Sequence, residues 1–108
     1  MHQVDSLDEM KAIISTGKPV LIYFSGVNCS ICHALKPKII DAFTKELPNI
    51  KLCEVQTDVH KELTSHFTVF SLPTILVYFD SKEFKRIGRN ISVPVFIQDV
   101  KRVYDLYI

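Results

Sequence analysis

A run of five consecutive apolar residues, Val20–Phe24, constrains the fold of this chain more than any other feature. Its β-branched and aromatic side chains favour a strand. A strand that is apolar at every position, rather than at every second one, is usually buried on both faces in the middle of an α/β sheet. Ile75–Phe79 is a second run of the same kind. We therefore expect a central sheet whose two faces are both covered by helices.

Apolar residues at helical spacing predict four helices around these strands. Ser6 and Glu9 form a capping-box pattern at the start of the first helix, and Gly17 with Pro19 can end it. Pro37 lies inside the second helix and is expected to kink it. The four helices are expected to begin at Ser6, at Ser30, after Asp58 and at Ser92, and the second is expected to extend to Glu46. Asp58 is expected to be the N-cap of the third helix, whose residues Val59, Leu63 and Phe67 face inward.

Two further segments complete the predicted sheet. Residues 50–56 are predicted to form a strand, and residues 83–88 a short edge strand. Because the turn at residues 80–82 is too short for a crossover, the last two strands must be antiparallel, so the sheet is mixed. With 108 residues, the chain has the length of one domain with a real hydrophobic core. The predicted architecture is a single α/β domain over residues 1–108.

Charge and hydropathy argue against several classes of partner. Lys and Arg total 13 against 12 for Asp and Glu, without the basic excess of a nucleic-acid binder. The longest apolar runs have about five residues, whereas a membrane span needs about 20. Residues 1–5 show neither the basic region nor the apolar region of a secretory signal. We therefore expect a cytoplasmic protein that binds neither nucleic acid nor membrane.

Cys29 and Cys32 lie between the first long predicted strand and the second predicted helix, a position that suits redox chemistry. At a helix N-terminus, free backbone N–H groups and the helix dipole stabilise the thiolate of Cys29. Cys32 follows one turn later on the same face, so it can attack a mixed disulfide on Cys29 and release the reduced partner. The spacing therefore predicts Cys29 as the nucleophile and Cys32 as the resolving thiol.

The cysteines also admit structural, haem and metal interpretations. Cys29 and Cys32 followed by His33 match the c-type haem attachment pattern, but haem attachment would need an export signal and a flat cavity. A zinc site needs four ligands, and this segment offers three at most. We therefore expect no cofactor and no metal. Cys53 is expected to be a small buried apolar side chain, with a regulatory thiol as the alternative.

The cysteine pair is one of several motifs spaced along the chain. The others are the strand Val20–Phe24, Pro37, Asp58, Ser71-Leu72-Pro73-Thr74 ahead of an apolar strand, and Gly88. Together these motifs resemble the thioredoxin family over essentially the whole chain, with a shortened first strand at residues 1–4. The resemblance implies a thioredoxin fold and a thiol–disulfide oxidoreductase acting on protein or small-molecule disulfides. It also implies a thioredoxin-reductase-like electron donor, no bound cofactor and a monomer.

The resemblance further implies a substrate groove beside the cysteines. The proline that matches Pro73 is cis in this family, lies against the cysteine pair and presents backbone for pairing with the substrate. The implied substrate-binding residues are Asn28, Phe70, Ser71, Leu72 and Gly88.

Some residues depart from the family pattern. Asn28 replaces the usual tryptophan, and Ser30-Ile31 between the cysteines leaves the reduction potential open. Tyr23 takes the place of the buried aspartate, and Glu54 takes that of the opposing lysine. We hypothesise that Glu54 accepts the proton of the resolving thiol, with the Tyr23 hydroxyl as its hydrogen-bond partner. The alternative is that Glu54 points to solvent from a strand near the sheet edge.

The departures leave more than one function open. The leading interpretation is the thiol–disulfide oxidoreductase. A second is a thioredoxin-fold binding module with little redox turnover, which the missing tryptophan and aspartate favour. A third is an oxidant or isomerase in an exported compartment. The reduction potential would separate the third from a reductant.

Overall fold

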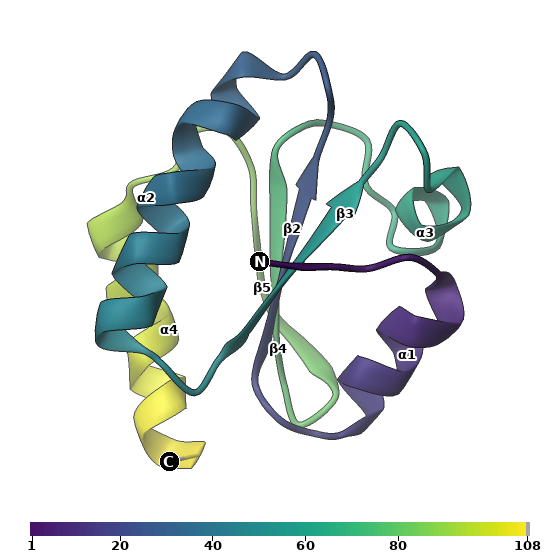
Figure 1. Ribbon diagram of the computed structural model, residues 1–108. Helices are drawn as coiled ribbons and strands as arrows, with labels where there is room; N and C mark the ends of the chain where they lie inside the picture. Colours follow the sequence, from purple (N-terminus) through teal and green to yellow (C-terminus); the bar gives the residue numbers. More distant parts are fainter. Residues whose placement is uncertain (108) are drawn as a thin grey trace.

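The computed structural model describes residues 1–107 and contains one sheet between two layers of helices (Figure 1). The strands are β1 (His2–Gln3), β2 (Val20–Ser25), β3 (Lys51–Gln56), β4 (Thr74–Phe79) and β5 (Lys82–Ile87). The helices are α1 (Leu7–Ser15), α2 (Ser30–Glu46), α3 (Lys61–His66) and α4 (Val93–Tyr107). α2 and α4 cover one face of the sheet, and α1 and α3 cover the other (Figure 1). The predicted order of strands and helices is confirmed.

The strand order β1-β3-β2-β4-β5 places β2 at the centre of the sheet. β2 pairs with β3 in parallel and with β4 antiparallel, and β4 pairs with β5 antiparallel. The turn between β4 and β5 has φ values of 54° at Asp80 and 63° at Ser81, as two-residue hairpin turns require. The mixed sheet predicted from this short connection is confirmed. β1 has only two residues, so the expected shortening of the first strand is confirmed too.

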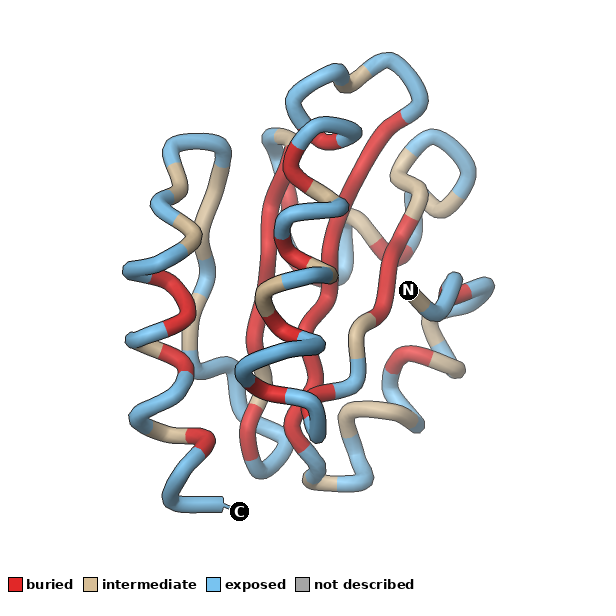
Figure 2. Tube along the Cα trace, turned by 60° about the vertical axis from the view of Figure 1, so that its left-hand side comes forward, coloured by how far each residue is buried: buried red, intermediate tan, exposed pale blue. Residues whose placement is uncertain are grey.

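The strands in the middle of the molecule are its most buried part (Figure 2), and all six residues of β2 are buried. Successive side chains of a strand point to opposite faces. Leu21 and Tyr23 join a core with residues of α2 and α4, whereas Ile22 and Phe24 join a second core with residues of α1 and α3. The burial of β2 on both faces confirms what its uninterrupted apolar run predicts.

The ends of α1 follow from its sequence. The Ser6 hydroxyl accepts a hydrogen bond from the Glu9 N–H at 3.0 Å, and the Glu9 carboxylate accepts one from the Asp5 N–H at 2.7 Å. Gly17, at a φ of 77°, turns the chain toward β2. α2 has the predicted bounds and continues through Pro37. Among residues 1–107, none of the helices has the length and apolar character that crossing a bilayer requires.

The expectation that Asp58 caps α3 is wrong. After β3 the chain makes a turn in which the N–H groups of Val59 and His60 both donate to the Gln56 carbonyl, at 3.2 and 3.0 Å. This turn delays the helix, so His60 takes the N-cap position and Val59 is 73% exposed instead of facing inward. The Asp58 carboxylate accepts instead from the Val27 N–H at 2.6 Å. Asp58 therefore braces the loop between β2 and α2.

Candidate active site

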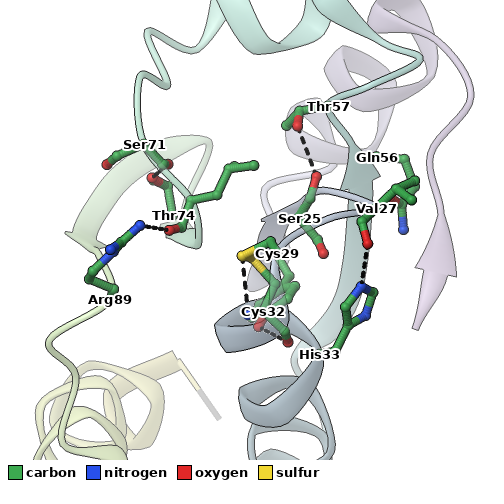
Figure 3. Close-up of a disulfide and its surroundings, with 12 residues drawn as sticks. Ser25, Val27, Cys29, Cys32, His33, Gln56, Thr57, Ser71, Thr74 and Arg89 are labelled. Carbon is green, nitrogen blue, oxygen red and sulfur yellow. Dashed lines mark hydrogen bonds between the residues drawn. A yellow bond between two sulfur atoms is a disulfide. The ribbon is translucent and has the colours of Figure 1, made fainter.

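Cys29 and Cys32 lie where the loop after β2 enters α2, and they are joined by a disulfide with 5.2 Å between their Cα atoms (Figure 3). Cys29 is the N-cap residue of α2, and its sulfur accepts a hydrogen bond from the Cys32 N–H at 3.2 Å. Cys29 is partly exposed, whereas Cys32 is completely buried. The expected placement of both cysteines is confirmed. Ser30 and Ile31, between them, are both exposed.

The loop before β4 carries a cis peptide bond between Leu72 and Pro73, as expected. The Thr74 hydroxyl donates to the Ser71 carbonyl at 2.6 Å and closes this loop. Leu72 packs against the same core cluster as Cys29 and Cys32. Pro73 itself is buried. The cis-proline loop and the cysteine pair therefore pack against the same core.

Gly26 permits the close approach of these two loops, a role that the sequence analysis did not assign. A Cβ atom on Gly26 would lie 2.9 Å from Leu72 Cδ1 and 3.4 Å from the Asp58 carboxylate. Real Cβ atoms are essentially never as close as 2.9 Å to another heavy atom, so Leu72 would have to move. The signal was available: Gly26 sits between a buried strand and the cysteine motif, where side chains packed against the backbone favour glycine.

The Tyr23 hydroxyl does not bind Glu54, so that part of the hypothesis is wrong. Although Tyr23 and Glu54 are paired in register on β2 and β3, the Tyr23 hydroxyl donates to the Cys32 carbonyl at 2.6 Å. The first turn of α2 lies over Tyr23 and presents that carbonyl as the acceptor. Burial raises the pKa of Tyr23 to about 12, and the negative charge of Glu54 adds to this rise. Tyr23 is therefore a neutral donor near pH 7.

Glu54 is only 1% exposed, so the alternative that it points to solvent is wrong as well. Its carboxylate accepts from Lys36 Nζ at 2.6 Å, from Gln3 Nε2 at 2.5 Å and from Gln56 Nε2 at 3.4 Å. Lys36 follows Cys32 by four residues, so both lie on the same face of α2. Glu54 thus lies under α2 as a buried carboxylate with a cationic partner.

The implied substrate-binding residues fall into two groups. Phe70, Ser71 and Gly88 line a pocket of about 290 Å³ together with Thr68, Thr74, Arg86 and Ile87. Phe70 is 90% exposed there, and Leu72 lies in the same loop. Asn28 is exposed in the loop before Cys29 and does not line this pocket. The structure thus brings the cis-proline loop and the end of β5 together, whereas Asn28 lies in the loop that carries Cys29.

His33 and Cys53 take no part in this geometry. His33 is exposed on the first turn of α2, and its Nε2 lies 3.0 Å from the carbonyl oxygen of Val27 in the preceding loop (Figure 3). Cys53 is a free, buried thiol in the core on the α1 and α3 side, and burial raises its pKa to about 11. No cluster of three His, Cys, Asp or Glu side chains that could hold a metal ion occurs within residues 1–107.

Comparison with known proteins agrees with this site. The family model described as Thioredoxin matches residues 3–101. The "Thioredoxin-like protein YdfQ" of Bacillus subtilis is 36% identical over 99% of this chain and 95% of its own length. A "Bifunctional thioredoxin reductase/thioredoxin" of Mycobacterium leprae is 25% identical over 84% of this chain and 20% of its own length.

The fold has close counterparts among solved structures. The thioredoxin of Fasciola hepatica superposes with a TM-score of 0.82 at 23% identity, covering 94% of this chain and 98% of its own. That structure supports the thioredoxin fold, and the family match with the disulfide-bonded pair supports the chemistry. The chain belongs to the thioredoxin family, and it is a thiol–disulfide oxidoreductase whose redox pair is Cys29 and Cys32.

Proposed function

We propose that the chain reduces disulfides of protein substrates, with Cys29 as the attacking thiolate and Cys32 as the resolving thiol. The observation that carries this proposal is the unequal exposure of the two cysteines. A substrate disulfide can reach the partly exposed Cys29, whereas the completely buried Cys32 can be reached only by the sulfur of Cys29. The order of attack follows from this difference in access.

The geometry of α2 favours an anionic sulfur on Cys29. The Cys32 N–H donates to it, and the first turn of α2 contains no acidic residue that would repel it. Free N–H groups at a helix N-terminus stabilise a negative charge and lower the pKa of a thiol there. Cys29 is therefore the thiol best placed to be deprotonated in the reduced protein.

The proposed reaction moves two electrons in two exchanges. The Cys29 thiolate attacks one sulfur of the substrate, a Cys29–substrate disulfide forms, and the substrate disulfide breaks, its leaving sulfur taking a proton from water. The Cys32 thiol then gives up its proton and attacks the Cys29 sulfur, which releases the second substrate thiolate. That thiolate is protonated in turn. The Cys29–Cys32 disulfide is the oxidised product of this cycle.

Three further roles belong to this proposal. Pro73 and its loop position the substrate, and the pocket beside Phe70, Ser71 and Gly88 receives its side chains, because this pocket adjoins the cis-proline loop. Glu54 accepts the proton of Cys32. Its place under α2, where it binds Lys36 one turn after Cys32, supports this role.

We further propose that a thioredoxin-reductase-like protein returns the electrons, so that the chain acts as a reductant in the cytoplasm. The relative from Mycobacterium leprae is named for both activities, which supports such a pairing.

Reduction of insulin disulfides by dithiothreitol tests the proposal. We expect the chain to accelerate this reaction, Cys29→Ser to reduce the rate to that of dithiothreitol alone, and Cys53→Ser to keep the activity of the unmodified chain. Insulin binding without acceleration would contradict the proposal and favour the binding module. Equilibration with glutathione would give the reduction potential, and a value near that of strong oxidants would contradict the reductant role.

A further inference from the structure

The main chain of Leu72, the residue before the cis bond, has one free group and one occupied group. Its carbonyl oxygen accepts a hydrogen bond from the Arg89 guanidinium at 3.1 Å. Its N–H has no acceptor within the part of the chain that the structure describes. An extended peptide that lies alongside this loop can pair with both main-chain groups of such a residue. Arg89 therefore occupies half of a main-chain pairing site beside the disulfide.

Arg89 carries an uncompensated charge, in contrast to the neighbouring Arg86. Arg86 donates to both oxygens of the Glu83 carboxylate at 3.1 Å, so its charge is paired. Arg89 is exposed, and among residues 1–107 no carboxylate lies within ion-pair distance of it. A guanidinium binds a carboxylate more strongly than a neutral carbonyl, because it can donate two parallel hydrogen bonds to the carboxylate.

The position of Arg89 puts this charge at the substrate side of the site. Figure 3 shows Arg89 together with Ser71 and Thr74 on one side of the cysteine pair, with Val27 and His33 on the other. Arg89 also directly follows Gly88, which lines the pocket beside the cis-proline loop. A peptide held by Leu72 would therefore pass close to the guanidinium.

We propose that Arg89 selects peptide disulfides that carry a carboxylate next to the cysteine. In the free protein Arg89 holds the Leu72 carbonyl. When an acidic peptide binds, the guanidinium transfers to the peptide carboxylate, and the released carbonyl accepts a main-chain N–H of the peptide. A neutral peptide must displace Arg89 without offering it a new partner, so it binds more weakly. This inference rests on the proposed function, because it assigns a substrate class to the same site.

Two disulfide-bonded peptides that differ only in Glu or Gln beside the cysteine test the proposal. We expect the unmodified chain to prefer the Glu peptide about fivefold in kcat/KM at low salt, the upper range for an exposed ion pair. Arg89→Met should bring this ratio to about one while the Gln peptide is reduced at least as fast as before. Arg102→Met, which removes the same charge from an exposed site on α4, should keep the ratio.

The outcomes separate the inference from the proposed function. An equal ratio in the unmodified chain and Arg89→Met, or an equal loss of rate for both peptides, would overturn the role of Arg89 and leave the reductase function standing. If neither peptide is turned over, binding is measured on the Cys29→Ser/Cys32→Ser variant by calorimetry, with serine in place of the peptide cysteines. A Glu preference there that Arg89→Met removes would support the inference although the proposed function had failed; equal affinities would overturn it.

Discussion

The two faces of the sheet use the same strands for different purposes. On the face under α2 and α4, buried polar groups lie among apolar ones: the Tyr23 hydroxyl, the Glu54 carboxylate and the sulfur of Cys32. On the face under α1 and α3, the buried side chains of β2 and β3 are Val20, Ile22, Phe24, Cys53 and Val55.

The difference shows how one fold separates chemistry from stability. Cysteine occurs on both faces, but only the pair at the start of α2 has an exposed member and a donated hydrogen bond. Cys53 has neither, and its environment penalises the thiolate. Environment, and not residue type, decides which thiol reacts.

The polar face, which is the face of the sheet under α2 and α4, should lose most of its catalytic function when Glu54 is changed. We expect Glu54→Gln to slow the step in which Cys32 resolves a mixed disulfide by about 100-fold, the lower range for loss of a general base. The isosteric amide can still accept from Lys36, so the fold should remain. Stopped-flow kinetics with a chromogenic mixed disulfide on Cys29 would measure this step alone. Glu46→Gln, the same change at the exposed end of α2, is the control, and an equal rate in both variants would remove Glu54 from the mechanism.

The stability of the polar face depends on the Lys36–Glu54 pair. Lys36→Met leaves the Glu54 carboxylate buried without its cation, and we expect a loss of about 2 kcal/mol in the free energy of unfolding. This is less than for a fully buried pair because the Lys36 side chain is 31% exposed. Urea unfolding measures the loss. Lys45→Met, which breaks the exposed pair with Asp41, should cost less than about 0.5 kcal/mol, and equal losses would contradict the comparison.

The pH dependence of the free energy of unfolding tests the environment of Cys53 on the apolar face, which is the face of the sheet under α1 and α3. Burial raises the pKa of the Cys53 thiol from the ordinary value of 9.0 to about 11 in the folded protein. Because the folded state holds this proton more tightly, the stabilisation is complete below about pH 9 and is lost as the pH rises through about 11. We therefore expect the free energy of unfolding to fall over this pH window, and less steeply in Cys53→Ala.

In the reduced protein at pH 8, a maleimide should label Cys29 well before Cys53. Equal labelling rates would be evidence against the contrast between the two thiols.

Much of the fold follows from the order of residues. The apolar runs of β2 and β4, the capping at Ser6 and the short β4–β5 turn each allow few alternatives, and the structure agrees with all of them. The redox pair was predictable for the same reason, because its chemistry depends on a position between strand and helix that the pattern already indicates.

The side-chain contacts of Tyr23, Glu54 and Lys36 under α2 were not predictable in the same way. Register pairs Tyr23 with Glu54, but the direction of each side chain depends on which carbonyl or amine α2 brings over the sheet. Lys36 had a signal, since it lies one turn after Cys32 and has the sign that a buried Glu54 needs. Asp58 was misassigned because a turn after β3 competes with helix initiation, which local capping rules do not anticipate.

The exposure of Ser30 and Ile31 has a consequence for protein engineering. Neither side chain belongs to a core cluster, so replacing them changes the electronic and steric surroundings of the two sulfurs without repacking the interior. Gly26, three residues before Cys29, is the opposite case, because any side chain there meets Leu72. A library of variants at Ser30 and Ile31 that keeps Gly26 would vary the reduction potential of the Cys29–Cys32 disulfide on a constant fold. The reduction potential of this enzyme can therefore be adjusted separately from its folding.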